Sequence, residues 1–147
     1  MKLVRFRFYH NIFLLIISLF LMDQRSLFGM WFHEWAGLIV CLFYILHLLL
    51  NWSWIKEVTT KLFGKINAKV RVNYLMDLLL FIGYTLIIMS GMAISRTIDF
   101  SWVGFDPQHR MIYRSMHTSV SMLVIIIMGI HLGLHWDWVL ARFRRSR

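Results

Sequence analysis

Four long apolar runs, separated by short polar segments, dominate the pattern of the chain. They cover residues 8–22, 31–52, 72–95 and 115–136 of 147. A helix needs roughly 20 residues to cross a hydrocarbon core of about 30 Å, and backbone groups in lipid must be hydrogen-bonded internally. The pattern therefore predicts an all-α membrane protein: one domain over residues 1–147, folded as an up-down bundle of four transmembrane helices.

The first apolar run is short enough to be compared with a secretory signal peptide. Asp23, Gln24 and Arg25 follow it directly, and no small-x-small cleavage site is present. These features favour a transmembrane helix over a signal peptide that is removed.

Basic residues are distributed unevenly between the two ends of the predicted bundle. Residues 53–71 mix apolar and basic side chains, which predicts an amphipathic helix lying on the membrane surface. Twelve of the sixteen lysines and arginines lie there or near the two termini, and four lie on the opposite side. The positive-inside rule then places both termini in the cytoplasm, with the protein in the cytoplasmic (inner) membrane. The formal net charge of +9 indicates this topology rather than nucleic-acid binding.

Two of the runs each carry a pair of histidines at the same spacing. His33 and His47 are fourteen residues apart in the second run, as are His117 and His131 in the fourth. An offset of 84 residues superimposes the two pairs, together with the Trp-x-Trp motif that follows each of them. Fourteen residues return a helix to nearly the same face, within roughly 40°, about 21 Å further along its axis. Each helix thus presents an imidazole near both ends of one face.

The predicted topology makes the second and fourth helices parallel, and parallel helices lie diagonally across an up-down bundle. His33 and His117 then share the outer depth, and His47 and His131 share the inner depth. Neutral imidazole is an axial ligand of haem iron, so the pattern predicts two bis-histidine sites for two haem b groups. The single cysteine, Cys41, excludes a Cys-x-x-Cys-His attachment motif. The alternative is a haem-free transporter or anchor subunit whose histidines bind a metal ion or relay protons.

Small residues accompany the histidines. Gly37 and Ser121 each lie four residues after an outer histidine, on the same face, and leave room for a flat macrocycle. Gly83 and Gly91 in the third run are interpreted in the same way.

Charged and polar residues near the two sites have alternative interpretations. His135 lies one turn beyond His131, where a hydrogen bond to an inner haem propionate is favoured over a two-ligand zinc site. Arg96, Arg110 and Arg114 either neutralise outer haem propionates or are solvated loop charges.

Asp77 lies near the inner end of the third run, where an acid faces the bundle, a partner or water. It either pairs with Arg71 or caps the start of the helix, or else it transfers protons at a quinone pocket beside the inner haem. His10 and His109 are interpreted as ordinary surface or interface residues.

The second run and the residues after it form the motif His-x13-His-x3-Asn-Trp-x-Trp-Ile, and the third run contains Ser90-Gly91. Over nearly the whole chain this resembles the small membrane cytochromes b, and most closely the flavinylation-associated cytochromes. The resemblance implies that His33, His47, His117 and His131 are haem ligands. It also implies electron transfer between the quinone pool and an extracytoplasmic redox partner, often a flavoprotein, as a subunit of a quinone-reactive oxidoreductase. The second copy departs from the motif, because His135 replaces the asparagine.

Overall fold

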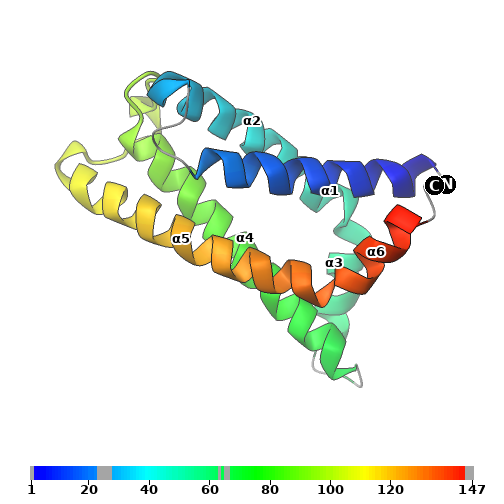
Figure 1. Ribbon diagram of the computed structural model, residues 1–147. Coiled ribbons are helices and arrows are strands. Elements are labelled where there is room, and N and C mark those ends of the chain that lie inside the picture. Colours follow the sequence, from blue (N-terminus) through cyan, green and yellow to red (C-terminus); the bar gives the residue numbers. More distant parts are fainter. Residues whose placement is uncertain (1, 23–27, 63, 65–66, 145–147) are drawn as a thin grey trace.

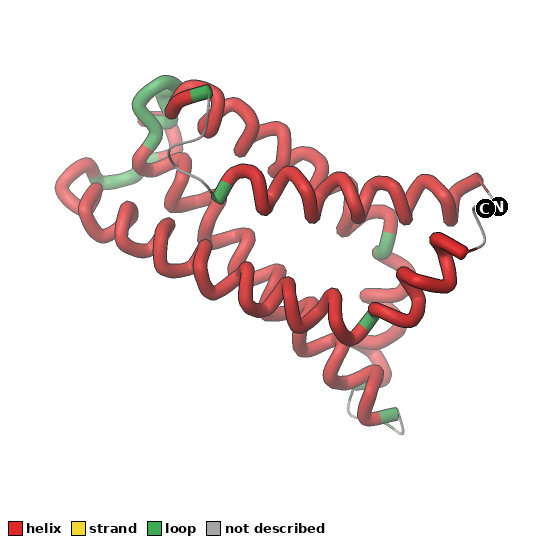
Figure 2. Tube along the Cα trace, viewed as in Figure 1, coloured by secondary structure: helices red, strands yellow, loops and turns green. Residues whose placement is uncertain are grey.

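The computed structural model describes residues 2–22, 28–62, 64 and 67–144, and none of them lies in a strand. Figure 2 shows helices joined by short loops. The helices are α1 (Lys2–Leu21), α2 (Gly29–Leu50), α3 (Trp52–Lys61), α4 (Ala68–Ile94), α5 (Arg110–Leu134) and α6 (Trp136–Arg144). Two 3-10 turns, η1 (Ser101–Val103) and η2 (Pro107–His109), precede α5.

Four of the helices, α1, α2, α4 and α5, are long and apolar enough to cross a membrane. For the described residues, the prediction of a helical fold with four helices long and apolar enough to span a membrane is therefore confirmed. The predicted boundaries are less accurate, since α1 begins at Lys2 rather than residue 8, and α5 begins at Arg110 rather than residue 115. Hydropathy marks the part of a helix that suits lipid, whereas the helical hydrogen bonds continue into the polar flanks.

The prediction of one amphipathic helix over residues 53–71 is wrong in its extent. α3 ends at Lys61, and residues 68–71 form the first turn of α4. Asn67 separates the two helices: its backbone is extended, and its side chain accepts a hydrogen bond of 2.9 Å from the Lys69 backbone N–H. Asparagine is a preferred residue at such a helix start. Residues 63, 65 and 66 lie outside the described part of the chain.

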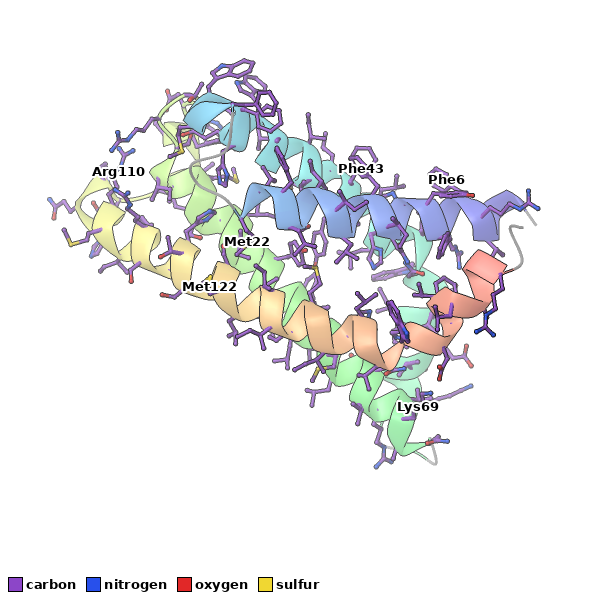
Figure 3. The ribbon with its side chains drawn as sticks, in the orientation of Figure 1. Phe6, Met22, Phe43, Lys69, Arg110 and Met122 are labelled. Atoms are coloured by element: carbon purple, nitrogen blue, oxygen red, sulfur yellow. The ribbon has the colours of Figure 1, made fainter. Side chains whose placement is uncertain are left out.

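The spanning helices alternate in direction (Figure 1). α1 packs beside α2, α4 packs closely beside α5, and α2 meets α4 over a short stretch. α2 and α5 run the same way, as predicted for a diagonal pair (Figure 1). Lys69 and Arg110, labelled in Figure 3, mark the starts of α4 and α5 at opposite ends of the molecule. The first residues of α1 lie at the same end as α3 and α6 (Figure 1).

Side chains from all four spanning helices meet between the ends of the bundle. Tyr84 of α4 donates a hydrogen bond of 2.9 Å to Ser18 of α1, and its hydroxyl lies 3.6 Å from the sulfur of Met128 of α5. The Tyr84 ring stacks on Tyr44 of α2, with ring centroids 5.1 Å apart. This group ties the two helical hairpins together.

The chain turns at two positions related by the 84-residue repeat. Asn51 separates α2 from α3, and His135 separates α5 from α6. Their backbone angles are nearly identical, with φ −105° and ψ 8° at Asn51 and φ −103° and ψ 7° at His135. Each backbone N–H is bonded to the carbonyl four residues earlier, at His47 (3.2 Å) and at His131 (3.3 Å). The repeat therefore comprises a long helix, a break and a short helix.

All seven tryptophans are exposed in the fold and lie near the ends of the spanning helices. One group is in α2 and η1, and the other is in α3 and α6. The groups are Trp31, Trp35 and Trp102, and Trp52, Trp54, Trp136 and Trp138. Tryptophan concentrates at both interfaces of a bilayer, so this distribution supports contact with lipid.

Candidate dihaem site

We refer to His33 and His117 as the outer pair and to His47 and His131 as the inner pair, following the predicted orientation. The outer pair comes from α2 and α5, with ring centroids 6.2 Å apart and ring planes at 76°. Beside the rings is a cavity of about 180 Å³, which Ser121 also lines. Met22 and Met122, labelled in Figure 3, lie on its wall. The parallel helices α2 and α5 thus bring two imidazoles together.

The His117 ring is held by α4. Its Nδ1–H donates a hydrogen bond of 3.0 Å to the Ile87 carbonyl, and the Ser90 hydroxyl lies 3.3 Å from the same nitrogen. Because a carbonyl can only accept, Nδ1 carries the proton and Nε2 keeps its lone pair. Gly91 lies against the ring: a Cβ at this position would be 3.1 Å from Cε1 of His117. A larger residue there would displace the imidazole.

His33 has a different environment. Its Nδ1 is buried without a hydrogen-bond partner, although the Leu21 backbone lies close to the imidazole. The neighbouring Glu34 fixes the start of α2 instead. Its carboxylate accepts hydrogen bonds of 2.8 Å from the Ser95 hydroxyl and 2.9 Å from the Arg96 backbone N–H, and a third from the Thr97 N–H at 2.8 Å. The position of His33 is thus set through the backbone.

α1 holds His47 of the inner pair. The Nδ1–H of His47 donates to the Asn11 side-chain oxygen at 3.0 Å, which leaves Nε2 with its lone pair. His10, which precedes Asn11 in α1, donates from Nε2 to the Phe43 carbonyl at 3.0 Å. Its ring stacks on that of His47, with ring centroids 6.2 Å apart. His10 is only 5% exposed and is an interface residue between α1 and α2.

α4 contacts the other inner histidine through Asp77. The Asp77 carboxylate oxygen lies 3.1 Å from Nδ1 of His131, within ion-pair distance but not aligned as a hydrogen bond. The expected pairing of Asp77 with Arg71 is wrong, because Arg71 donates to the Gly64 carbonyl at 2.8 Å. Capping is also wrong, because α4 begins at Ala68 and places Asp77 beyond its first two turns.

The two histidines of the inner pair are near each other. His47 is close enough to His131 for an electrostatic interaction.

The remaining predicted site residues differ in how near they lie to the histidines. Ser121 donates to the His117 carbonyl at 2.6 Å, and Gly37 has nothing within 4 Å of where a Cβ would lie. The His135 ring packs on His131, with centroids 4.7 Å apart. The side chains of Arg96 and Arg114 are exposed.

Gly83 and Arg110 contribute to the fold rather than to the histidine sites. A Cβ at Gly83 would collide with Val124, so this glycine allows α4 and α5 to pack closely. Arg110 donates to the Ile94 carbonyl at 2.7 Å and joins the start of α5 to the end of α4.

The arrangement limits which metal centres these residues suit. In the part of the chain that the structure describes, no three His, Cys, Asp or Glu side chains converge on one point. A structural zinc site normally takes four protein ligands, whereas a six-coordinate haem iron needs only two axial side chains from the protein. Paired imidazoles, one member of each pair with Nδ1 bonded to an oxygen and a lone pair on Nε2, suit the second kind of centre.

Three contacts of the site are not predicted from the sequence: Asn11 with His47, Asp77 with His131, and Glu34 with the loop after α4. Asn11 carries a local signal, because it lies beside His10 at the start of the apolar run of residues 8–22, where few other polar residues occur. The other two join residues more than fifty positions apart, and no local pattern specifies which side chains meet.

Comparison with known proteins finds no matching family model, no matching curated protein and no matching solved structure. The fold and the site together define a helical protein with four helices that can span a membrane and paired histidines between two of them. The likeness to the flavinylation-associated cytochromes stays a prediction from the sequence motif.

Proposed function

We propose that the protein is a membrane electron-transfer cytochrome b. His33 and His117 would hold an outer haem b, and His47 and His131 an inner one. The observation that carries the proposal is the convergence of His33 and His117, from parallel helices, on one cavity with their rings 6.2 Å apart. The repeat gives the inner histidines the same spacing, and His47 and His117 both have Nδ1 bonded to an oxygen.

The surroundings of the outer pair also suit a flat, mostly apolar group. Gly91 allows α4 to approach the His117 ring, and Gly37 leaves open space on α2. The cavity of about 180 Å³ is smaller than the roughly 300–1,000 Å³ of typical ligand pockets. The cavity would therefore have to widen for a haem to bind.

In this function, residues around the histidines would orient the imidazoles, exclude water and bind the haem propionates. When bound, haem supplies reversible one-electron chemistry at iron. The protein would orient the imidazoles through Asn11 and the Ile87 carbonyl, and the apolar helices would exclude water. Arg96 and Arg114 are exposed near the outer pair, where a haem propionate would find a cationic partner. His135 packs against His131 and would donate a hydrogen bond to an inner propionate.

The proposal extends to topology and partners. The twelve-to-four distribution of basic residues supports a cytoplasmic-membrane protein with both termini in the cytoplasm. α3 would then lie along the inner surface with its lysines at the lipid headgroups. Electrons would pass between the quinone pool and an extracytoplasmic redox protein of the flavoprotein class. Asp77, beside the inner pair, is the candidate for proton exchange with a quinone.

The test is haem content and the visible spectrum of the purified protein, oxidised and dithionite-reduced. We expect two spectral components in the unmodified protein. His33→Ala and His117→Ala should each lose one component, and His47→Ala and His131→Ala should each lose the other. His109→Ala, at an exposed histidine paired with Asp106, is the matched control and should retain both.

Two outcomes would contradict the proposal. If the folded protein binds no haem, the haem-free transporter or anchor subunit becomes the better interpretation. If all four substitutions remove the same component, the two-site assignment fails.

A further inference from the structure

The contact between Asp77 and His131 is not accounted for by haem ligation alone. Asp77 lies on α4 and His131 on α5, and their side chains are 35% and 29% exposed. The 3.1 Å separation is short enough for a hydrogen bond, but the imidazole is not aligned for one. Torsions that end in a planar ring are broad, so a modest rotation of the imidazole aligns Nδ1–H with the carboxylate.

The four histidines differ in the group that faces Nδ1. His117 faces a backbone carbonyl and His47 faces a neutral amide. His33 has no hydrogen-bond partner on Nδ1. His131 is the one member of these two pairs that faces a carboxylate. The inner pair therefore has a carboxylate at a ring nitrogen. The carboxylate near the outer pair, Glu34, acts on His33 only electrostatically, because its oxygens accept hydrogen bonds from the loop after α4.

A carboxylate that accepts a hydrogen bond from one ring N–H fixes the tautomer and makes the other ring nitrogen a stronger electron donor. A stronger donor stabilises the more oxidised metal, and the hydrogen bonding of axial ligands is a lever on haem potential. An amide or a backbone carbonyl exerts the same influence more weakly, because a charged acceptor makes the stronger hydrogen bond.

We infer that Asp77 is a positioning residue that holds His131 through Nδ1 and makes the inner site the lower in reduction potential of the two. The inference rests on the proposed function. It assigns Asp77 a role that requires no quinone, and it gives the bundle an intrinsic asymmetry that the repeated histidine motif does not contain.

The test compares Asp77→Asn with Asp137→Asn by redox titration in detergent, with haem quantified per protein. Asp137, an exposed acid on α6, provides the same chemical change away from His131. In Asp77→Asn, the reduced-to-oxidised ratio of the inner component at a fixed ambient potential should rise about tenfold, which is about 59 mV for one electron. The outer component should not move, and Asp137→Asn should leave both unchanged. The inner component is the one that His131→Ala removes.

A second measurement does not depend on haem. Nuclear magnetic resonance of protein labelled with ¹⁵N-histidine, without haem, reports which ring nitrogen of His131 carries the proton. Asp77→Asn should shift the His131 nitrogens, and Asp137→Asn should not. If Asp77→Asn lowers haem content, Asp77→Glu should restore both content and the lower inner potential.

The outcomes separate this inference from the proposed function. Two haems with an inner potential unchanged by Asp77→Asn would overturn the inference and leave the cytochrome intact. Unchanged His131 nitrogens in Asp77→Asn would also overturn it. A wild-type protein without haem would refute the proposed function and, with it, the assignment of a potential.

Discussion

Gly91→Ala isolates the outer site with the smallest possible perturbation. In the structure, a Cβ at position 91 would lie 3.1 Å from Cε1 and 3.4 Å from Nδ1 of His117. The shorter distance is below an ordinary carbon–carbon contact of about 3.5–4.0 Å, so the ring must move by a few tenths of an ångström. The ring is bonded to the Ile87 carbonyl at 3.0 Å, and movement weakens that bond.

The substitution stabilises the helix but also overpacks the contact with His117. The two effects act differently on folding and on haem binding. Replacing a helical glycine by alanine stabilises a helix by about 1 kcal/mol, while overpacking costs about 1–3 kcal/mol. Without haem, the His117 ring can turn away, so the free energy of unfolding should change little. Haem binding requires the ring in place, so the cost appears in affinity. A loss of about 1–3 kcal/mol is roughly a 5- to 140-fold weaker outer site.

The assay is titration of haem into the haem-free protein in detergent, with the outer and inner components resolved by redox titration. Gly129→Ala is the matched control, because Gly129 lies in α5 with nothing within 4 Å of where its Cβ would be. This control should bind both haems normally. Equal outer affinity in the wild type and Gly91→Ala, or a loss confined to the inner component, would refute the reasoning.

Three further predictions address topology, packing and quinone. A reporter active only in the cytoplasm should be active when fused at the carboxyl terminus and silent when inserted near Pro107; the reverse pattern would exchange the inner and outer assignments. Gly83→Ala should lower the free energy of unfolding by about 1–3 kcal/mol because its Cβ collides with Val124, and Val124→Ala should recover part of this loss in the double variant. Additive losses would contradict that contact. Asp77→Asn should slow haem reduction by a quinol analogue more than reduction by a soluble one-electron donor; equal slowing would leave Asp77 with its effect on His131 alone.

The sequence predicts the spanning helices well because the signal is physical and local. Backbone groups in lipid must be bonded within the helix, so a long apolar run has few structural alternatives. The helix ends are predicted less well, because they depend on single polar groups. Asn67 illustrates this: its side chain begins α4 inside the stretch that amphipathic periodicity assigns to one surface helix.

The contacts of the candidate site likewise fall into those that the sequence predicts and those that depend on helix packing. The spacing and the predicted topology together predict that His33 and His117 share a depth, and the structure brings their rings together. Spacing cannot predict that Asp77 meets His131, because that contact depends on the packing of α4 against α5. The sequence accordingly indicates an acid near the inner histidines but leaves its role open between pairing with Arg71, capping the helix start and proton transfer.

The helix breaks explain why the repeated motif tolerates His135 in place of asparagine. At both breaks the bonding is carried by the backbone, and the carbonyl of the inner histidine accepts the N–H of the break residue. The side chains are thus free to differ. Asn51 donates from its amide to the His47 carbonyl at 2.8 Å, whereas the His135 ring packs on His131. The repeat preserves the position of each inner histidine four residues before its helix break, and the differences between the copies fall on the groups around His131. Asp77 and His135 both lie there, so this is the position at which two similar half-sites acquire different properties.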